Sequence, residues 1–150
     1  MISQNKQKLI ELEKSWNFLF HWSLNNIDIL EPRQAYNRSK STGEMEKDWD
    51  PCICATNYVN IAIFRSLINS INIVWKSDSA FGMKEWKLYF IATKNLLEWA
   101  KYKVWKVFIL DKSDFKYHNK IEFRSKKKIK PISYLEVWID DLPEDIEIKI

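Results

Sequence analysis

Four side chains near residue 115 have the types and the spacing of a metal site or an acid–base cluster. Asp111, Asp114, His118 and Glu122 follow one another at intervals of three, four and four residues. On a continuous helix they would share one face, where carboxylates and an imidazole bind a divalent metal or exchange protons. The residues 115–123 alternate between apolar and polar types, which favours a hairpin instead. A hairpin has no such face, so we expect no metal site.

The other residues able to do chemistry form no recognisable catalytic arrangement. The sequence pairs His21 with no nucleophile, and neither histidine has the upstream arginine that is typical of helical ribonucleases of bacterial defence systems. Cys52 and Cys54 have no second pair, which is weak evidence for zinc and favours ordinary packing. Phosphate-loop and hydrolase motifs are also absent. We therefore expect a protein that is not an enzyme and that holds no cofactor.

Arg65 is the charged residue that most needs an explanation. It lies in an otherwise apolar segment, 53–75, and an unpaired charge is costly to bury. A structural ion pair is the ordinary interpretation, and contact with an anion or with RNA is the functional one.

Lysines supply most of the net charge of +4 and could form a surface for nucleic-acid phosphates. One group lies in the segment 83–108 and another follows residue 123, although a lysine-rich edge strand would look the same. The abundance of Lys, Asn and Ile is also typical of an AT-rich genome, which weakens the inference. The candidate nucleic-acid-binding residues are Arg65, Lys87, Lys94, Lys101, Arg124, Lys126, Lys127, Lys128 and Lys130.

Hydrophobic periodicity predicts the elements that must position these residues. Apolar residues recur at helical spacing in three segments, 4–30, 51–76 and 83–108, with a loop over 31–50. The segment 115–150 alternates in polarity and predicts a small antiparallel β element, with a further helix as the alternative. We therefore expect a single domain, 1–150, of the mainly α class: a three-long-helix bundle with a C-terminal β element.

Eight tryptophans in 150 residues exceed what such a bundle can bury. Trp16, Trp75 and Trp86 fall on the predicted core faces. Four others do not, and they are candidate partner-binding residues: Trp22, Trp49, Trp99 and Trp105. Tryptophan is enriched in protein interfaces.

These observations favour a non-catalytic protein-interaction module, or a small subunit of a larger bacterial or phage assembly. Its partner would be another protein or a second copy of the chain. The alternative is a subunit that binds the backbone of RNA or DNA. The chain shows no secretory signal and no apolar run of membrane-spanning length. We expect a cytoplasmic protein with no membrane partner.

Overall fold

The computed structural model describes residues 3–23, 28–32, 36–38, 45–47, 51–68 and 77–149. Within these ranges the chain is mostly β-structure, and its longest α-helix has 12 residues. The predicted mainly α, three-helix bundle is therefore wrong. Each of the three segments predicted as a long helix contains at least one strand.

The first predicted helix, 4–30, ends after about three turns. α1 spans Gln4–Ser15, and Ser3 caps it by accepting a hydrogen bond from the amide three residues later at 3.1 Å. Trp16 then adopts a left-handed conformation with φ 65°, which ends the helix. β1 follows at Phe18–Trp22. The apolar spacing that predicted one helix over 4–30 thus belongs to a helix followed by an aromatic strand, and aromatic residues favour strands.

The second predicted helix, 51–76, also divides into a strand and a shorter helix. β4 spans Ile53–Ala55, and α2 spans Val59–Leu67. In the turn between them the Thr56 hydroxyl accepts a backbone amide at 3.1 Å, a local bond that competes with helix formation. Residues 69–76 lie outside the described ranges.

The third predicted helix, 83–108, departs furthest from the structure. The segment contains β6 Lys87–Thr93 and α3 Lys94–Ala100. It also overlaps the end of β5 Ser79–Lys84 and most of β7 Val104–Asp111. β5 and β6 form a hairpin that turns at Glu85 and Trp86, whose φ angles are 54° and 67°. Two positive φ angles characterise the type I′ turn, for which Asn-Gly is the usual sequence signal. Since that signal is missing here, the helical period continues through the turn without interruption.

The remaining elements are short. They are β2 Tyr36–Arg38, β3 Met45–Lys47, the 3-10 helices η1 Lys112–Asp114 and η2 Ile139–Asp141, and the strands β8 Lys116–Asn119, β9 Glu122–Ser125, β10 Ser133–Trp138 and β11 Ile146–Lys149. β2 and β3 pair with each other inside the predicted loop, 31–50. The strands of 115–150 are not an appendage, because each joins a sheet, and three of the four pair with a strand from an earlier part of the chain.

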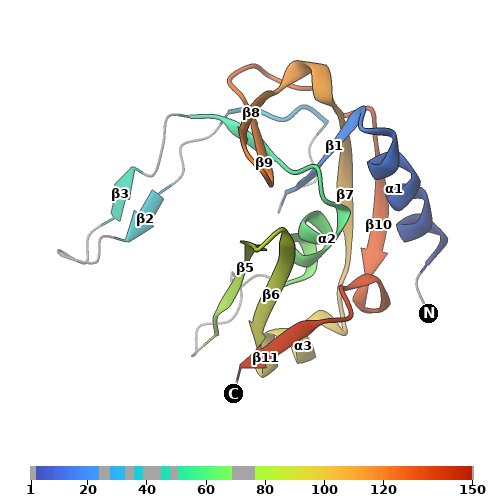
Figure 1. The fold of residues 1–150 in the computed structure, drawn as a ribbon, viewed down its shortest axis with the longest axis vertical. Helices are drawn as coiled ribbons and strands as arrows, with labels where there is room; N and C mark the ends of the chain where they lie inside the picture. Colours follow the sequence, from blue (N-terminus) through green and yellow to red (C-terminus); the bar gives the residue numbers. More distant parts are fainter. Residues whose placement is uncertain are drawn as a thin grey trace.

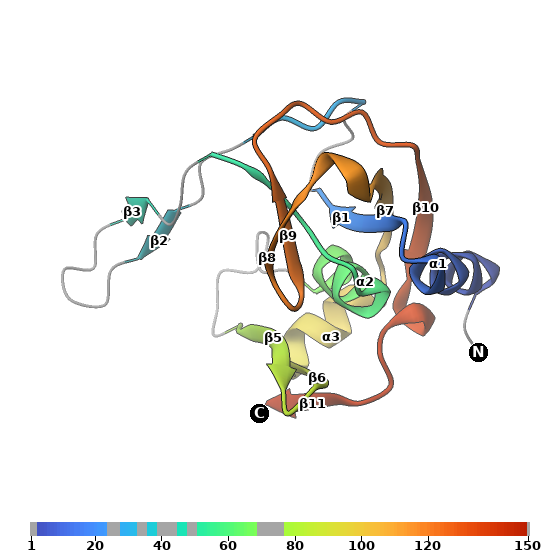
Figure 2. The ribbon, with the colours of Figure 1, turned by 45° about the horizontal axis from the view of Figure 1, so that its top comes forward.

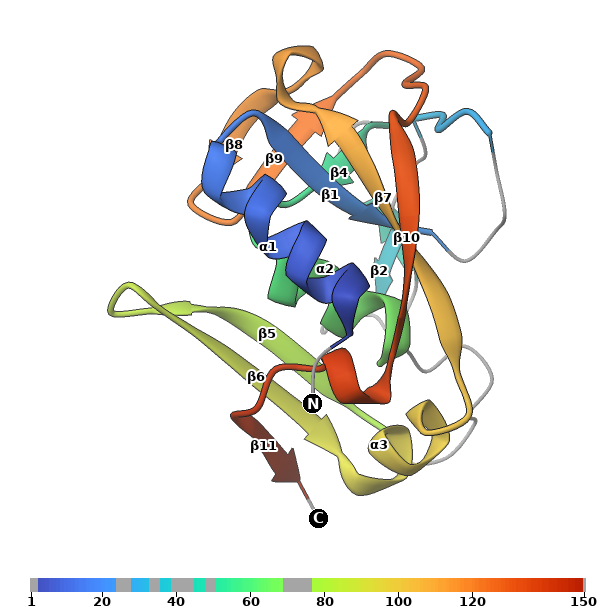
Figure 3. The same cartoon turned by 90° about the vertical axis from the view of Figure 1, so that its right-hand side faces the viewer.

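Apart from the β2–β3 hairpin, the described strands form three sheets around α2. Their strand orders are β1–β7–β10, β4–β9–β8 and β11–β6–β5. A bridge between Phe20 and Thr56 links the first two sheets. Figures 1 and 2 show α2 between the β1–β7–β10 sheet and the β11–β6–β5 sheet. Figure 3 shows α1 running alongside the first of these sheets, where it contacts β1 and β10.

The core has two parts, one on each face of β1. Phe20 packs with residues of α1 and α2, whereas its neighbour Leu19 packs with Ile53 and other residues of the second sheet. Phe64 of α2 is fully buried, and its ring centroid lies 5.1 Å from that of Phe90 on β6. α2 therefore joins the two larger parts of the fold through its apolar faces.

Candidate binding site

A cavity of about 420 Å³ opens beside α2, and we call it the Arg65 cavity. Its walls come from β1, β4, α2, β5 and the turn between β8 and β9. Most of the lining side chains are apolar, with a few polar groups among them. The lining residues are Phe20, His21, Trp22, Cys54, Ala55, Thr56, Ile61, Ala62, Arg65, Phe81, Ile121 and Glu122. Apolar walls with a few polar groups are typical of ligand-binding pockets.

The Arg65 guanidinium lies between two aromatic rings. Its central carbon is 4.6 Å from the Trp22 ring centroid and 5.4 Å from that of Phe81. In the described part of the chain it makes no ion pair and no hydrogen bond, and burial lowers its pKa. An arginine nevertheless stays charged at neutral pH. The cavity therefore presents a charged donor group that no described residue pairs.

The aromatic contacts stabilise a charge that is partly buried and that no described residue hydrogen-bonds. A cation–π contact contributes about 0.5 to 2 kcal/mol, whereas burying an ion costs several kcal/mol. The indole Nε1 of Trp22 in the same wall is also buried, and it has no hydrogen-bond partner among the residues that the structure describes. A ligand with acceptor oxygens in the cavity would satisfy the Arg65 guanidinium.

His21 and Cys54 fix the opposite side of the cavity. His21 Nδ1 lies 2.6 Å from the carbonyl oxygen of Cys54, so the imidazole donates to the backbone of β4 and not to the thiol. Burial, together with the nearby Glu122 and Cys52, raises the pKa of the Cys54 thiol to about 12. At neutral pH this sulfur is therefore a protonated thiol, which is a poor nucleophile.

We expect Cys54 to react very slowly with iodoacetamide in the folded protein. A thiol with a pKa of about 12 is ionised roughly a thousandfold less at pH 8 than an ordinary cysteine. The measurement is mass spectrometry of the Cys52→Ser variant, in which Cys54 is the cysteine that remains. The rate should rise about tenfold per pH unit up to pH 10, with circular dichroism checking the fold. An alkylation rate that levels off near pH 9 would contradict the raised pKa of Cys54. The same variant unfolded in guanidinium provides the reference rate of an ordinary cysteine.

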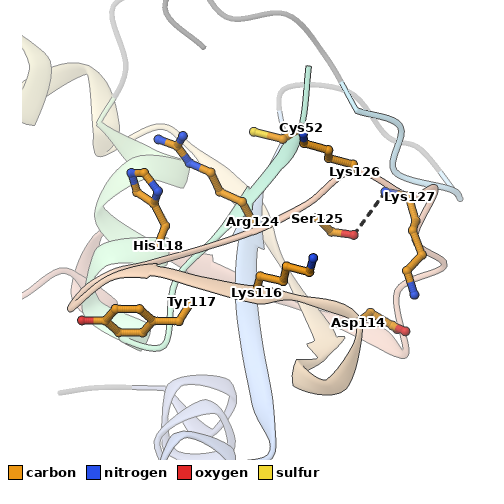
Figure 4. A pocket seen from close by; sticks show the side chains of 9 residues that line it. All are labelled: Cys52, Asp114, Lys116, Tyr117, His118, Arg124, Ser125, Lys126 and Lys127. Carbon is orange, nitrogen blue, oxygen red and sulfur yellow. Dashed lines mark hydrogen bonds between the residues drawn. The ribbon is translucent and has the colours of Figure 1, made fainter. Parts of the chain in front are cut away.

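A second hollow, of about 560 Å³, lies along the β8–β9 hairpin, and we call it the basic hollow. Figure 4 shows Lys127 and Asp114 at one end of it and His118 and Tyr117 at the other. Positively charged residues dominate its lining, with Asp114 as the one carboxylate. The lining residues are Cys52, Asp114, Lys116, Tyr117, His118, Arg124, Ser125, Lys126 and Lys127.

The strand register explains why cations gather in the basic hollow. Lys116 pairs with Arg124, and Arg124 pairs with Cys54, so the three residues form a row across the sheet on one face. Arg124 Nε also lies 2.5 Å from Glu122 Oε2, which neutralises that carboxylate. The hollow thus keeps a net positive charge.

The basic run predicted from the sequence divides at this hollow. Arg124, Lys126 and Lys127 line it, whereas Lys128 and Lys130 do not. Lys128 instead approaches a glutamate, Glu31, at 3.4 Å on the surface. The predicted lysine line of the third helix does not exist as a helix face, because its members belong to different elements. Lys87 begins β6, Lys94 begins α3 and Lys101 follows the end of α3.

The structure separates the tryptophans that were predicted to bind a partner. Trp22 lines the Arg65 cavity, and Trp105 is partly buried, with its indole N–H donating to the Ser23 carbonyl. Trp99 on α3 is 47% exposed. Trp49 lies outside the described residues.

Two tryptophans assigned to the core are instead on the surface. Trp16 is 68% exposed and Trp86 is 77% exposed, so both predictions are wrong. Both follow from the turns that were missed, because each residue has a positive φ at the end of an element. The Lys120 ammonium lies 3.5 Å from the centroid of the Trp86 ring, and this contact joins the tips of the β5–β6 and β8–β9 hairpins. Trp75 lies outside the described residues.

The four residues of the possible metal cluster fall on β7, η1, β8 and β9. His118 Nε2 lies 3.9 Å from Glu122 Oε2. Among the residues that the structure describes, no group of three or more His, Cys, Asp or Glu side chains is arranged to hold a metal. The helix face that the spacing would need is absent from this part of the chain.

Comparison with known proteins finds no match for this chain among protein-family models, curated proteins or solved structures. None of the helices in the described ranges has the length and apolar character needed to cross a membrane.

Proposed function

We propose that the protein is a binding module and that the Arg65 cavity is its recognition site, which takes an anionic group. The observation that carries this proposal is the charged guanidinium, which lines the cavity and has no acceptor within the described ranges of the chain. Guanidinium groups bind phosphate and carboxylate in a bidentate manner, and these contacts are among the strongest hydrogen bonds in proteins. The ligand class is therefore a phosphorylated or carboxylated compound.

The apolar walls support a ligand with a flat or apolar body attached to the anion. Phe81, Ile61 and Ile121 line the cavity together with the two aromatic neighbours of β1, Phe20 and Trp22. Such walls stabilise an aromatic ring by removing its surface from water. A small inorganic anion would leave them without a partner, so we expect it to bind more weakly.

The chemistry of the lining residues supports binding in preference to catalysis. The high pKa of the Cys54 thiol, about 12, disfavours a nucleophilic role. The His21 ring is held by a backbone carbonyl, which orients it as part of the wall. A protein partner bound through the predicted tryptophans is less favoured, because Trp22 and Trp105 are both partly enclosed.

Replacing Arg65 by leucine should abolish anion binding while stabilising the empty protein. Two charged hydrogen bonds, at about 1.5 to 3 kcal/mol each, correspond to a loss of affinity of at least about a hundredfold. Removing a partly buried charge that no described residue pairs should raise the melting temperature by a few degrees. Calorimetric titration measures the first effect, and a thermal melt without ligand measures the second.

The ligand probes come in matched charged and neutral pairs: adenosine monophosphate with adenosine, and benzoate with benzyl alcohol. Lys103→Leu is the control variant, because Lys103 is another partly buried cation but does not line the cavity. It should leave the affinity for adenosine monophosphate and benzoate unchanged. The proposal fails if neither charged probe binds, or if Arg65→Leu binds them as the wild type does. A lower melting temperature in Arg65→Leu would give the arginine a structural role.

A further inference from the structure

The Arg65 cavity and the basic hollow adjoin each other. Cys54 and Glu122 line the cavity, whereas Cys52 and Arg124 line the hollow. The two sulfur atoms lie 3.7 Å apart, and Arg124 Nε lies 2.5 Å from Glu122 Oε2. Each of these contacts joins one wall of the cavity to one wall of the hollow. The two spaces therefore meet at these four side chains, and a ligand that crosses this boundary would reach both.

We propose that one ligand occupies both spaces and that this ligand is the end of a single-stranded nucleic acid. This inference rests on the function proposed for the Arg65 cavity. The terminal nucleotide enters the cavity, and the phosphates that follow it lie in the basic hollow. The occupant is thus a chain of phosphate groups with a flat ring at its end.

The charges of the basic hollow fit a phosphate chain. Lys116 and Lys127 are exposed and have no ion-pair partner in the described part of the molecule, and Arg124 and Lys126 line the same space. Each phosphate that such cations neutralise contributes to affinity by releasing counterions. Glu122 at the boundary does not repel the chain, because Arg124 already pairs with its carboxylate.

The size and walls of the Arg65 cavity favour a single strand over a duplex. Its volume of about 420 Å³ lies near the lower end of the range for ligand pockets, about 300 to 1,000 Å³. One nucleotide fits such a space, whereas a base pair with its two backbones does not. The aromatic rings of Trp22 and Phe81 line this space, where they can contact the edge or face of a base.

The test compares a short and a longer ligand on the full chain. Adenosine monophosphate probes the cavity, and a single-stranded tetranucleotide with the same terminal nucleotide probes both spaces. We expect the tetranucleotide to bind about tenfold more tightly at low salt. Its affinity should also depend more steeply on salt: the slope of the logarithm of the binding constant against the logarithm of the salt concentration should be more negative by about 0.7 for each added phosphate contact. Lys116→Gln/Lys127→Gln should remove this gain and leave the affinity for adenosine monophosphate unchanged. Arg65→Leu should weaken both ligands at least about a hundredfold.

The control variant is Lys94→Gln/Lys101→Gln, which removes two exposed lysines, one at the start of α3 and one directly after its end. It should bind the tetranucleotide as the wild type does, and a loss here would place the phosphates on α3 and overturn the inference. A tetranucleotide that binds no better than adenosine monophosphate would also overturn it, while leaving the proposed function intact if Arg65→Leu still abolishes binding. If neither ligand depends on Arg65, the proposed function itself fails. A blunt duplex that binds as tightly as the single strand would contradict the single-strand assignment.

Discussion

Phe64→Ala is expected to lower the free energy of unfolding by about 3 to 5 kcal/mol. Phe64 is fully buried in α2, and its ring contacts Phe90 on β6 and Phe81 on β5 at centroid distances of 5.1 and 6.4 Å. Truncation removes these ring contacts and leaves a cavity where α2 faces the β11–β6–β5 sheet. Since small domains have a total stability of about 5 to 15 kcal/mol, this is a large share of it.

Urea unfolding followed by circular dichroism measures the effect of Phe64→Ala. The midpoint should fall while the slope of free energy against urea stays the same, because the native state still buries the same layers. Tyr102→Ala is the matched control, since Tyr102 is also aromatic but 88% exposed. It should change the stability by less than about 0.5 kcal/mol. Equal losses in the two variants would contradict the central position of α2.

Asp141→Ala is expected to lower the free energy of unfolding by about 3 to 5 kcal/mol, because it removes a buried charge and its hydrogen bonds. The Asp141 carboxylate is completely buried and accepts hydrogen bonds from the Ser3 amide at 2.9 Å, the Ser3 hydroxyl at 3.0 Å and the Trp138 amide at 3.1 Å. The Lys6 ammonium donates to the backbone carbonyl of the same residue at 2.6 Å. Removing the carboxylate leaves the partly buried donors of Ser3 and Trp138 without an acceptor and the buried Lys6 without the negative charge of Asp141.

The neighbouring Asp140 provides the control for Asp141, because it is exposed. Asp140→Ala should be nearly neutral, within about 0.5 kcal/mol. The double variant Ser3→Ala/Asp141→Ala should cost less than the sum of the two single variants, by about 0.5 to 3 kcal/mol. Strict additivity would show that the carboxylate does not hold the start of α1, whatever its own effect on stability.

The helices were overpredicted from the sequence because the signals that end them are not those of ordinary turns. Trp16 and Trp86 take positive φ angles, a conformation for which glycine or asparagine is the usual signal. Helical spacing therefore continued unbroken through two turns. The alternation in 115–150 did indicate strands, but it could not show that β10 pairs with β7 or β11 with β6.

The candidate site was partly visible in the sequence. Arg65 stood out because it is a lone charge in an apolar segment, and Arg124, Lys126 and Lys127 stood out as a basic run. Neither signal revealed the ring of Phe81, which reaches the guanidinium through the packing of β5. Nor did the sequence select Lys116, which enters the basic hollow through its pairing with Arg124. Contacts between strands far apart in the chain depend on register, and register is a property of the folded sheet.

The contact between Trp86 and Lys120 determines how often the two hairpins beside the Arg65 cavity separate at their tips. A surface cation–π contact contributes about 0.5 to 1 kcal/mol, so it is broken in roughly a fifth to a third of the molecules at any moment. The two hairpins that carry it also supply Phe81 and Glu122 to the Arg65 cavity. Their tips can therefore separate many times during the lifetime of the native state, without unfolding. Acetylation of Lys120, which removes its charge, would shift this population further toward the separated form.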